Sequence, residues 1–445
     1  MRTSDNSERI TRGAFHFPAI CALFIMSVAS CVGRAEPVAQ HDDGASGRSV
    51  VVWISLDGFR PDYFDRAETP TLDMLMREGA WSRELAPVFP SLTFPSHVAQ
   101  ATGVTVSEHG APGNSFYDSE IGMQWRYPPY SELVESEAIW FTAPRQGVRT
   151  AVVDWTMSHQ QTGEIRSDYF GERYDGRLSD DERLGRVLEI WRNDTHEEPL
   201  RLLMGYATAT DSAGHRFGPD APEMSAVINQ TDRIVGRFVE GLKETFREKM
   251  DENDELYLLI TTDHGMSEVH SLVNAAAMLG LESTRGIRIV TSGNVGAVFL
   301  NEYEPASDRE AQMERMIDAA AEHEFARVFR KGETPAEWGY EHPTRTGDLT
   351  LVLDKGYTFS TRPEGVVGDA REHGGPLGMH GYNVTENPEM LGITILWRYP
   401  EPLSGADLGP VHSLQLHPTV CKLLGIDPAP KATHDPIRIP ASIRR

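Results

Sequence analysis

Cysteine is scarce in this chain of 445 residues, which has three, at Cys21, Cys31 and Cys421. The first two fall in an apolar N-terminal stretch, so the rest of the chain contains Cys421 alone and no disulfide framework stabilises it. Cys421 lies in the apolar helical pattern LHPTVCKLLG, and we expect it to be a buried small hydrophobic residue.

Positive charge is also in short supply, because 66 acidic residues outnumber 42 lysines and arginines and leave a formal net charge of −24. A surface of this sign excludes binding to a nucleic-acid polymer or an anionic membrane through bulk charge. It would also repel an anionic substrate unless a local positive centre, such as bound metal ions, overrides the global field.

The apolar N-terminal stretch AFHFPAICALFIMSVAS lacks the length of a membrane span. It follows three arginines and has the length of a signal peptide, but His16 and Pro18 interrupt it. Because it is too short and too broken for a comfortable span, it predicts an exported protein.

Two cleavage sites fit this leader. VASC, ending at Cys31, resembles a bacterial lipobox, which would make Cys31 the lipidated first residue of a membrane-anchored lipoprotein. The small residues Gly33 and Ala35 in GRA instead suit ordinary cleavage and release into the bacterial periplasm. An uncleaved tether is the third alternative.

The chain shows no internal repeat and no long low-complexity tract. We expect a signal segment over residues 1–35, a polar linker over 36–48, a main domain over 49–432 and a C-terminal tail over 433–445. Within the main domain, residues 286–362 read as strand, helix, strand, strand, which predicts a small α+β insertion.

Four continuous apolar runs predict strands that are buried on both faces, and hence a mostly parallel sheet. Each run ends at an aspartate: Asp57, Asp154, Asp211 or Asp263. Helical patterns such as SDDERLGRVLEIWR, with the cap-like Ser179, lie between them. The alternation predicts an α/β fold with a central sheet flanked by helices.

Acids and imidazoles gather at these predicted strand ends. Ligands of open α/β sheets bind beyond the carboxyl ends of the strands, where Asp57, Asp211 and Asp263 are expected and His264 follows directly. Asp211 and His215, in DSAGH, are four residues apart. That spacing suits either neighbouring positions on a helix surface or two ligands of one metal ion.

His380, in GMHGY, completes a set of three aspartates and three histidines. Oxygen and nitrogen ligands without thiolate fit Zn²⁺ or Mn²⁺ in a catalytic site better than a structural zinc. Six ligands are too many for one tetrahedral zinc but suit two ions, which lie about 3.5–4 Å apart in phosphoryl-transfer enzymes. The sequence therefore predicts two divalent metal ions, with Zn²⁺ preferred.

A nucleophile is offered by Thr93 in PSLTFPSH, where Pro95 favours the start of a helix. A hydroxyl at a helix N-terminus and beside a metal is favoured as the alkoxide. Without a metal, Thr93 would be an N-cap residue and nothing more, and both readings stay open at this point.

Six segments occur in an order that resembles the nucleotide pyrophosphatase/phosphodiesterase family of the alkaline phosphatase superfamily. They are ISLDGFRPDY, PSLTFPSH, HGAPGNSFYD, DSAGHRFGPD, TTDHGM and GMHGY. The resemblance covers about residues 50–430 and implies an alkaline-phosphatase-like catalytic domain.

The resemblance implies roles for the matching residues. Thr93 would be both the nucleophile and a metal ligand, Asn114 would donate to a phosphoryl oxygen, and Phe94 and Tyr174 would flank the leaving nucleoside. One metal would be bound by Asp211, His215 and His380, and the other by Asp57, Asp263, His264 and Thr93.

The implied activity is metal-dependent hydrolysis of small phosphate diesters or pyrophosphates, with nucleotide-type substrates favoured, through a phospho-threonine intermediate. Two departures concern the substrate. Leu92 and Ser96 replace a lysine and an asparagine of the family pattern TKTFPNH, and DWTMSHQ at Asp154–Gln160 replaces a WPGSE-like stretch. A phosphomonoesterase, a phosphonate hydrolase and a phospholipid-headgroup phosphodiesterase remain alternatives, as does a binding protein with an idle metal site.

Overall fold

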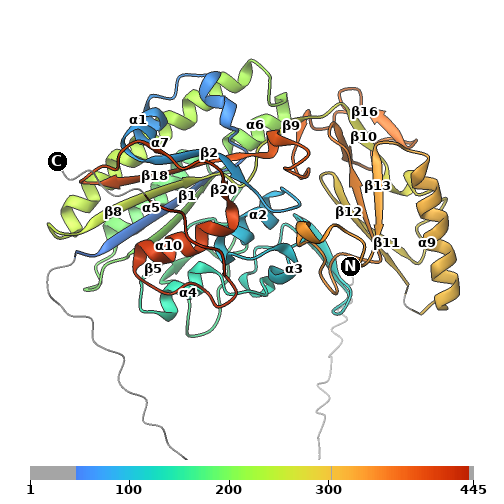
Figure 1. Cartoon of the computed structure of the whole chain (residues 1–445), viewed down its shortest axis with the longest axis horizontal. Helices are drawn as coiled ribbons and strands as arrows, with labels where there is room; N and C mark the ends of the chain where they lie inside the picture. Colours follow the sequence, from blue (N-terminus) through green and yellow to red (C-terminus); the bar gives the residue numbers. More distant parts are fainter. Residues whose placement is uncertain (1–46, 302, 440–445) are drawn as a thin grey trace, which may run out of the picture. The chain divides into compact units, whose positions relative to one another are not determined.

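The computed structural model describes residues 47–301 and 303–439, and its main element is a nine-stranded sheet (Figure 1). The strand order is β19–β2–β18–β8–β1–β7–β5–β6, with β20 beside β2. The strands are β1 (Ser49–Leu56), β2 (Ala80–Ala86), β5 (Thr150–Val152), β6 (Tyr169–Phe170), β7 (Leu202–Ala207), β8 (Glu255–Thr261), β18 (Gly392–Tyr399), β19 (Ala406–Asp407) and β20 (Val411–His412).

The sheet is mostly parallel, as the apolar runs predicted. Strands β8, β1, β7, β5 and β6 all run in the same direction. One inner strand, β18, is antiparallel to both of its neighbours, β8 and β2. A hydrophobic run carries no information about strand direction, so this reversal was not foreseen.

Two large hydrophobic clusters flank this sheet, one on each face. Along β1, Val52 and Ile54 belong to one cluster, whereas Val51 and Trp53 belong to the other. Successive side chains of a strand point to opposite faces, so a strand covered on both sides must be apolar throughout. This explains why the run at β1 shows no alternation.

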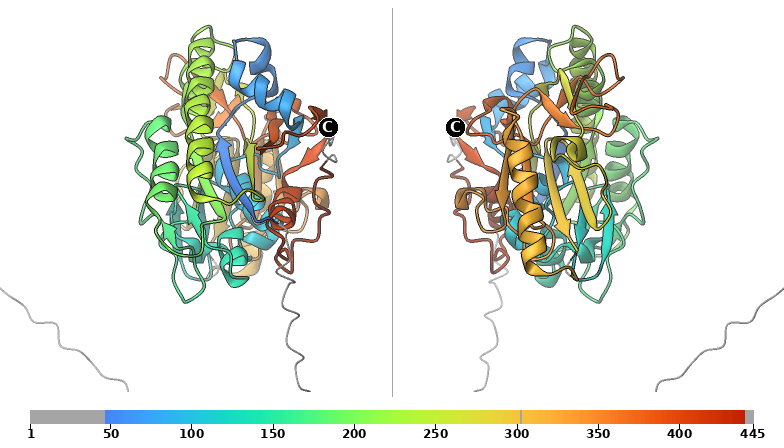
Figure 2. Two further views of the ribbon diagram at one scale, coloured as in Figure 1. Left: turned by 90° about the vertical axis from the view of Figure 1, so that its left-hand side faces the viewer. Right: turned by 90° about the vertical axis from the view of Figure 1, so that its right-hand side faces the viewer.

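Helices cover both faces, and α5 and α7 lie side by side on one of them (Figures 1 and 2). Helix α5 starts at a capping box, in which the Ser179 Oγ accepts from the Glu182 N–H and the Glu182 carboxylate accepts from the Ser179 N–H. The first face carries α1 (Pro70–Glu78), α5 (Asp180–Asn193) and α7 (Glu223–Lys249), and the second carries α4 (Ile139–Arg145) and α10 (Leu416–Leu424).

A second sheet of four antiparallel strands lies within the predicted insertion, and α9 packs on it (Figures 1 and 2). The predicted order of strand, helix, strand and strand is present, with one further strand, β11, at its start. The elements are β11 (Ile287–Ser292), β12 (Val295–Leu300), α9 (Ala306–Ala321), β13 (Ala326–Arg330) and β14 (Leu349–Leu353).

Some sequence predictions concern the chain ends. The leader, the lipobox with Cys31 and nearly all of the linker lie outside the described residues. Among the helices that are described, none has the length and apolar character needed to cross a membrane. Cys421, in α10, is fully buried with a free thiol, as predicted.

Candidate metal centre and active site

Two neighbouring parallel strands deliver three of the expected ligands. Asp57 follows β1 directly, and Asp263 and His264 follow β8. Gly58 turns the chain sharply after Asp57 with a φ of 65°, a backbone angle that glycine adopts at little cost. Its N–H donates to the Asp263 Oδ1 at 3.2 Å, which ties the two strand ends together.

The prediction that Asp211 ends a strand is wrong. Strand β7 stops at Ala207, and Asp211 lies in the first turn of helix α6 (Ala209–Phe217). The apolar character of the run continues into the helix, so composition alone did not show where the strand stops. His215 lies one turn further on, with its Nε2 3.3 Å from the Asp211 Oδ1. Asp211 and His215 are therefore neighbours on one helix, and their side chains are close enough to serve one metal ion, which stays a prediction.

His380 joins this group from a distant part of the chain. It follows the short strand β17 (Gly378–Met379), which pairs with β9 (Ser267–Glu268) just beyond His264. Its Nε2 lies 3.4 Å from the Asp211 Oδ1 and 3.3 Å from the His215 Nε2. Its ring stacks on that of His264 at a centroid distance of 3.5 Å.

The three histidines share one hydrogen-bonding pattern. In each ring, Nδ1 donates to a backbone carbonyl, at 2.7 Å for His215, 2.8 Å for His264 and 3.1 Å for His380. A carbonyl accepts but cannot donate, so the neutral ring carries its proton on Nδ1 and offers the Nε2 lone pair. Backbone carbonyls that fix the tautomer in this way are typical of metal-binding histidines.

These side chains form two groups with the geometry of metal sites. Asp57, Asp263 and His264 make one group, and Asp211, His264 and His380 make the other, with the ligand atoms of each group within 4.8 Å of one another. His264 belongs to both groups, so the two lie next to each other. His215 borders the second group through the contacts given above.

The donor set fits divalent cations. Asp57 Oδ1, Asp211 Oδ1 and Asp263 Oδ2 are buried and have no hydrogen-bond partner among the described residues. A buried carboxylate oxygen without a partner is costly, and coordination of a metal ion removes that cost. The fit follows from the three orphaned oxygens together with the three available Nε2 lone pairs.

The electrostatics of the site support the same conclusion. Burial, together with repulsion from Asp211 and Asp263, raises the pKa of Asp57 well above its usual value. Burial also disfavours ionisation of Asp211, but the attraction of His215 outweighs it and lowers the pKa of Asp211 to about 2. In turn, Asp211 outweighs the effect of burial on His215 and raises its pKa to about 8. Three carboxylates at one buried point call for added positive charge.

Thr93 lies at this centre. It is the first residue of helix α2 (Thr93–Thr102), and its Oγ1 is 3.2 Å from the His264 Nε2. The N-cap position is held by Leu92, so the reading of Thr93 as the N-cap is wrong. Its hydroxyl therefore lies among the candidate ligands, at a helix N-terminus that favours negative charge.

A cavity of about 300 Å³ opens beside Thr93 and contains the other predicted substrate residues. Phe94, Asn114 and Tyr174 all line it. The Asn114 Oδ1 accepts from the Phe94 N–H at 2.9 Å, which leaves the amide nitrogen of Asn114 as a donor. Tyr174 is 42% exposed, with the Arg183 guanidinium 4.2 Å from its ring centre.

Three further residues of the site were missed by the sequence analysis. His97, fully buried, lies one helical turn after Thr93 and places Nδ1 2.9 Å from the Thr93 carbonyl and 3.4 Å from the Asp263 Oδ2. Tyr206 donates its hydroxyl to the Asp57 Oδ2. Tyr127 lines the cavity and meets the Phe94 ring edge-on at 5.8 Å. In the sequence, only its position four residues after Thr93 indicated that His97 could lie on the same side of a helix as the nucleophile.

The segment DWTMSHQ, which departs from the family pattern, forms part of the cavity wall. Asp154 and His159 line the cavity, and Arg183 pairs with Asp154 at 2.5 Å. Asp154, Met157 and Gln160 have φ values of 60°, 54° and 51°, an uncommon region for residues other than glycine. Such backbone strain concentrates at functional sites.

The fold and the site together describe an α/β domain in which strand ends and two helices present a hydroxyl beside two adjacent Asp/His groups that could each hold a metal ion. Residues 51–383 match the family described as type I phosphodiesterase / nucleotide pyrophosphatase. The chain belongs to this family, and it is a hydrolase of phosphoester and pyrophosphate bonds.

Individual relatives agree with this assignment. A pyrophosphatase/phosphodiesterase of Schizosaccharomyces pombe is 29% identical over 76% of this chain and 68% of its own length. The human ectonucleotide pyrophosphatase/phosphodiesterase family member 7 is 26% identical over 94% and 88%, respectively. The solved structure of murine ectonucleotide pyrophosphatase/phosphodiesterase 5 matches with a TM-score of 0.73 at 24% identity, over 86% of this chain and 96% of that one, and confirms the fold.

Proposed function

We propose that this chain is a metal-dependent phosphodiesterase and pyrophosphatase that uses Thr93 as a covalent nucleophile. The observation that carries the proposal is the 3.2 Å contact between the Thr93 Oγ1 and the His264 Nε2, beside three orphaned carboxylate oxygens. A hydroxyl in such a place can be held as the alkoxide, which is what an attack on phosphorus requires.

Two divalent cations, preferably Zn²⁺, would supply Lewis-acid charge that draws the phosphate to the site and stabilises the negative charge of the reaction. Asp57, Asp263 and His264 would hold one of them, next to Thr93. Asp211, His215 and His380 would hold the other, with His264 close to both.

The reaction has two steps at Thr93. Its Oγ1 attacks phosphorus and forms a phospho-threonine while the bond to the leaving oxygen breaks. Water then attacks the same phosphorus, breaks its bond to Oγ1 and restores the hydroxyl. The Asn114 amide, fixed by the Phe94 N–H, donates to a phosphoryl oxygen as charge develops on it.

Nucleotide-type diesters are the favoured substrates. The rings of Phe94 and Tyr174 line a cavity of about 300 Å³ beside the nucleophile, and aromatic faces of this kind stack on bases. We further propose that residues 49–432 form the catalytic domain with an insertion at 286–362. The leader in the sequence and the prefix "ecto" in the relatives' names support export.

The test is the hydrolysis of a bis-nitrophenyl phosphate and a nitrophenyl phosphate, measured side by side on the zinc-loaded protein. We expect the diester to be the better substrate and Thr93→Ala to lower its turnover by about 10³-fold or more, because the nucleophile is lost. Thr93→Ser, which keeps a hydroxyl, is the matched control and should retain measurable turnover. A monoester rate well above the diester rate would point to a phosphomonoesterase, and normal turnover by Thr93→Ala would exclude the covalent route.

A further inference from the structure

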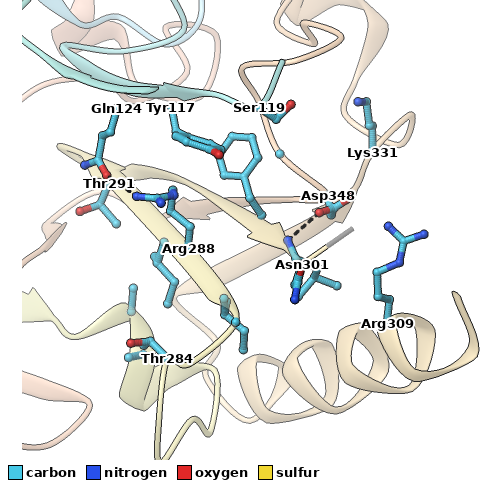
Figure 3. A pocket seen from close by; sticks show the side chains of 18 of the residues that line it. Tyr117, Ser119, Gln124, Thr284, Arg288, Thr291, Asn301, Arg309, Lys331 and Asp348 are labelled. Carbon is cyan, nitrogen blue, oxygen red and sulfur yellow. Dashed lines mark hydrogen bonds between the residues drawn. The ribbon is translucent and has the colours of Figure 1, made fainter. Parts of the chain in front are cut away.

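A groove of about 750 Å³ lies outside the active site, between the sheet of the insertion and a hairpin of the main domain (Figure 3). The hairpin is formed by β3 (Ser115–Asp118) and β4 (Met123–Arg126). Its volume is within the range of ligand sites in proteins, roughly 300–1,000 Å³. None of its lining residues belongs to the candidate metal centre or to the cavity beside it.

Three cationic side chains line this groove: Arg288 on β11, Arg309 on α9 and Lys331 just after β13 (Figure 3). Within residues 47–301 and 303–439, no carboxylate oxygen lies within 4.0 Å of the charged nitrogens of any of them. Neighbouring Arg330, by contrast, pairs with both Glu310 and Glu314.

These three cations line one groove in a chain whose acids exceed its bases and give it a net charge of −24. The Arg309 Nε is shielded from solvent and has no hydrogen-bond partner among the described residues. A buried donor without a partner is unfavourable, so an anionic ligand at this point would be stabilised.

The remaining polar groups of the groove suit hydroxyls. Between the cations lie Asn301 and Asp348, and Asp348 is held in place because its Oδ2 accepts from the Leu300 N–H at 2.8 Å (Figure 3). A carboxylate inside a cationic groove disfavours a compact ion such as phosphate. It favours a ligand that brings hydroxyl donors together with its negative charges.

An aromatic wall completes the groove. The Tyr117 ring lies on the hairpin side and meets the Phe299 ring edge-on at 4.9 Å, and the Arg288 guanidinium lies 4.3 Å from the Tyr117 ring centre. Arg288 is also tied to the hairpin through Gln124, its Nη1 lying 3.3 Å from the Oε1. An aromatic surface of this kind is a common platform for the apolar face of a sugar ring.

We propose that this groove is a second binding site, for an anionic saccharide whose phosphate or carboxylate groups pair with Arg288, Arg309 and Lys331. The sugar hydroxyls bind Asp348 and Asn301, and the ring lies against Tyr117. Guanidinium groups pair well with both phosphate and carboxylate, so the charge of the ligand can come from either. The site is independent of the hydrolytic reaction.

Titration calorimetry of the zinc-loaded protein tests this proposal with two probes, glucose 1,6-bisphosphate and trigalacturonate. At least one should bind, more weakly at high salt, because exposed ion pairs are screened. Arg288→Ala/Lys331→Ala should weaken that binding about tenfold or more, because two charge-assisted hydrogen bonds to the anion are lost. The bound probe identifies whether phosphate or carboxylate supplies the charge.

The matched control is Arg233→Ala/Arg237→Ala, which removes the same charge from the exposed side of α7. It should leave binding unchanged, and both double variants should keep the parent melting temperature and diesterase rate. Binding that survives Arg288→Ala/Lys331→Ala would place the probe elsewhere, including at the metal centre, and would overturn the proposal. So would equal affinity for inorganic phosphate, or no binding of either probe.

Discussion

At the scale of single residues, the orientation of a side chain in the candidate active site is set by hydrogen bonds to neighbouring residues that take no part in the reaction. Asn114 accepts from the Phe94 N–H through its side chain, and its own backbone N–H donates to the Ser292 Oγ at 3.0 Å. Its backbone carbonyl accepts from the Tyr127 N–H at 2.7 Å. With the amide oxygen engaged, the orientation of the amide nitrogen is fixed before any substrate arrives.

Asn114→Ala is expected to lower kcat on a diester by about 10²–10³-fold, because it removes a donor to developing charge. Asn114→Asp keeps the oxygen that accepts from the Phe94 N–H but replaces the donor with a second oxygen. It should lose a similar factor while keeping the parent melting temperature. Near-normal kcat for Asn114→Asp would show that Asn114 acts only through its backbone neighbours.

Tyr206 offers a second prediction at this scale, because its hydroxyl donates to the Asp57 Oδ2. We expect Tyr206→Phe to weaken zinc binding by about 10–100-fold, as is typical when a partner of a metal ligand is lost. The matched control is Tyr257→Phe on β8, whose hydroxyl donates to the half-buried Glu255 carboxylate at 2.7 Å, away from the metal centre. Zinc titrations that give equal affinities for the two variants would refute the role of Tyr206.

At the scale of elements, the hairpin β11–β12 brings the insertion to the active site. The Ser292 Oγ at its tip accepts from the Asn114 N–H, and a Cβ on Gly293 would lie 3.1 Å from the His380 carbonyl. The insertion is thus in contact with both a proposed donor and a proposed metal ligand. We expect these two contacts at the turn, at Ser292 and Gly293, to help hold Asn114 and His380 in place.

Arg345, shortly before β14, fastens the insertion to the main domain. Its guanidinium pairs with Asp118 and Glu135, each at 2.8 Å, and donates to the Gly110 and Leu133 carbonyls. Arg345 and Asp118 are both buried, and this contact lowers the pKa of Asp118 against the effect of burial.

Arg345→Ala should destabilise the protein by about 3–5 kcal/mol, because it leaves the Asp118 charge buried without its partner. In the double variant Arg345→Met/Asp118→Asn neither charge is present, so the loss should be smaller. Urea unfolding of both variants measures the difference. Equal losses in the two variants would show that the Asp118 charge needs no partner.

At the scale of the whole molecule, stability depends on the charge balance at the centre. Asp57, Asp211 and Asp263 come from three separate parts of the chain, and each has a buried oxygen without a partner among the described residues. Folding brings these carboxylates together at one point, so any cation that binds the folded state offsets part of that cost.

Removal of metal with a chelator is therefore expected to lower the melting temperature, and added Zn²⁺ should restore it. At a free zinc concentration of 100 times Kd the stabilisation is about 2.7 kcal/mol. Thr93→Ala leaves the six proposed Asp and His ligands in place and should respond much as the parent does, whereas Asp263→Asn should respond less. Scanning calorimetry that shows the same melting temperature with chelator and with zinc would contradict this account.

The sequence by itself determined the architecture and supplied the candidate residues of the site. Continuous apolar runs and helical spacing gave the α/β fold and a mostly parallel sheet, because burial on both faces demands apolar residues throughout a strand. Motifs in a fixed order identified the family, together with Asp57, Thr93, Asp211, His380 and the other expected ligands.

Only the tertiary structure decided how these parts meet. It showed that Asp211 lies on a helix, where an apolar run had suggested the end of a strand. It also showed that β18 runs antiparallel to the strands on either side of it. It also added His97, Tyr206 and the groove beside Arg288, whose partners are distant in sequence. Contacts between distant segments depend on how those segments pack in the folded chain. The local sequence around a residue therefore does not predict which distant side chain it will contact.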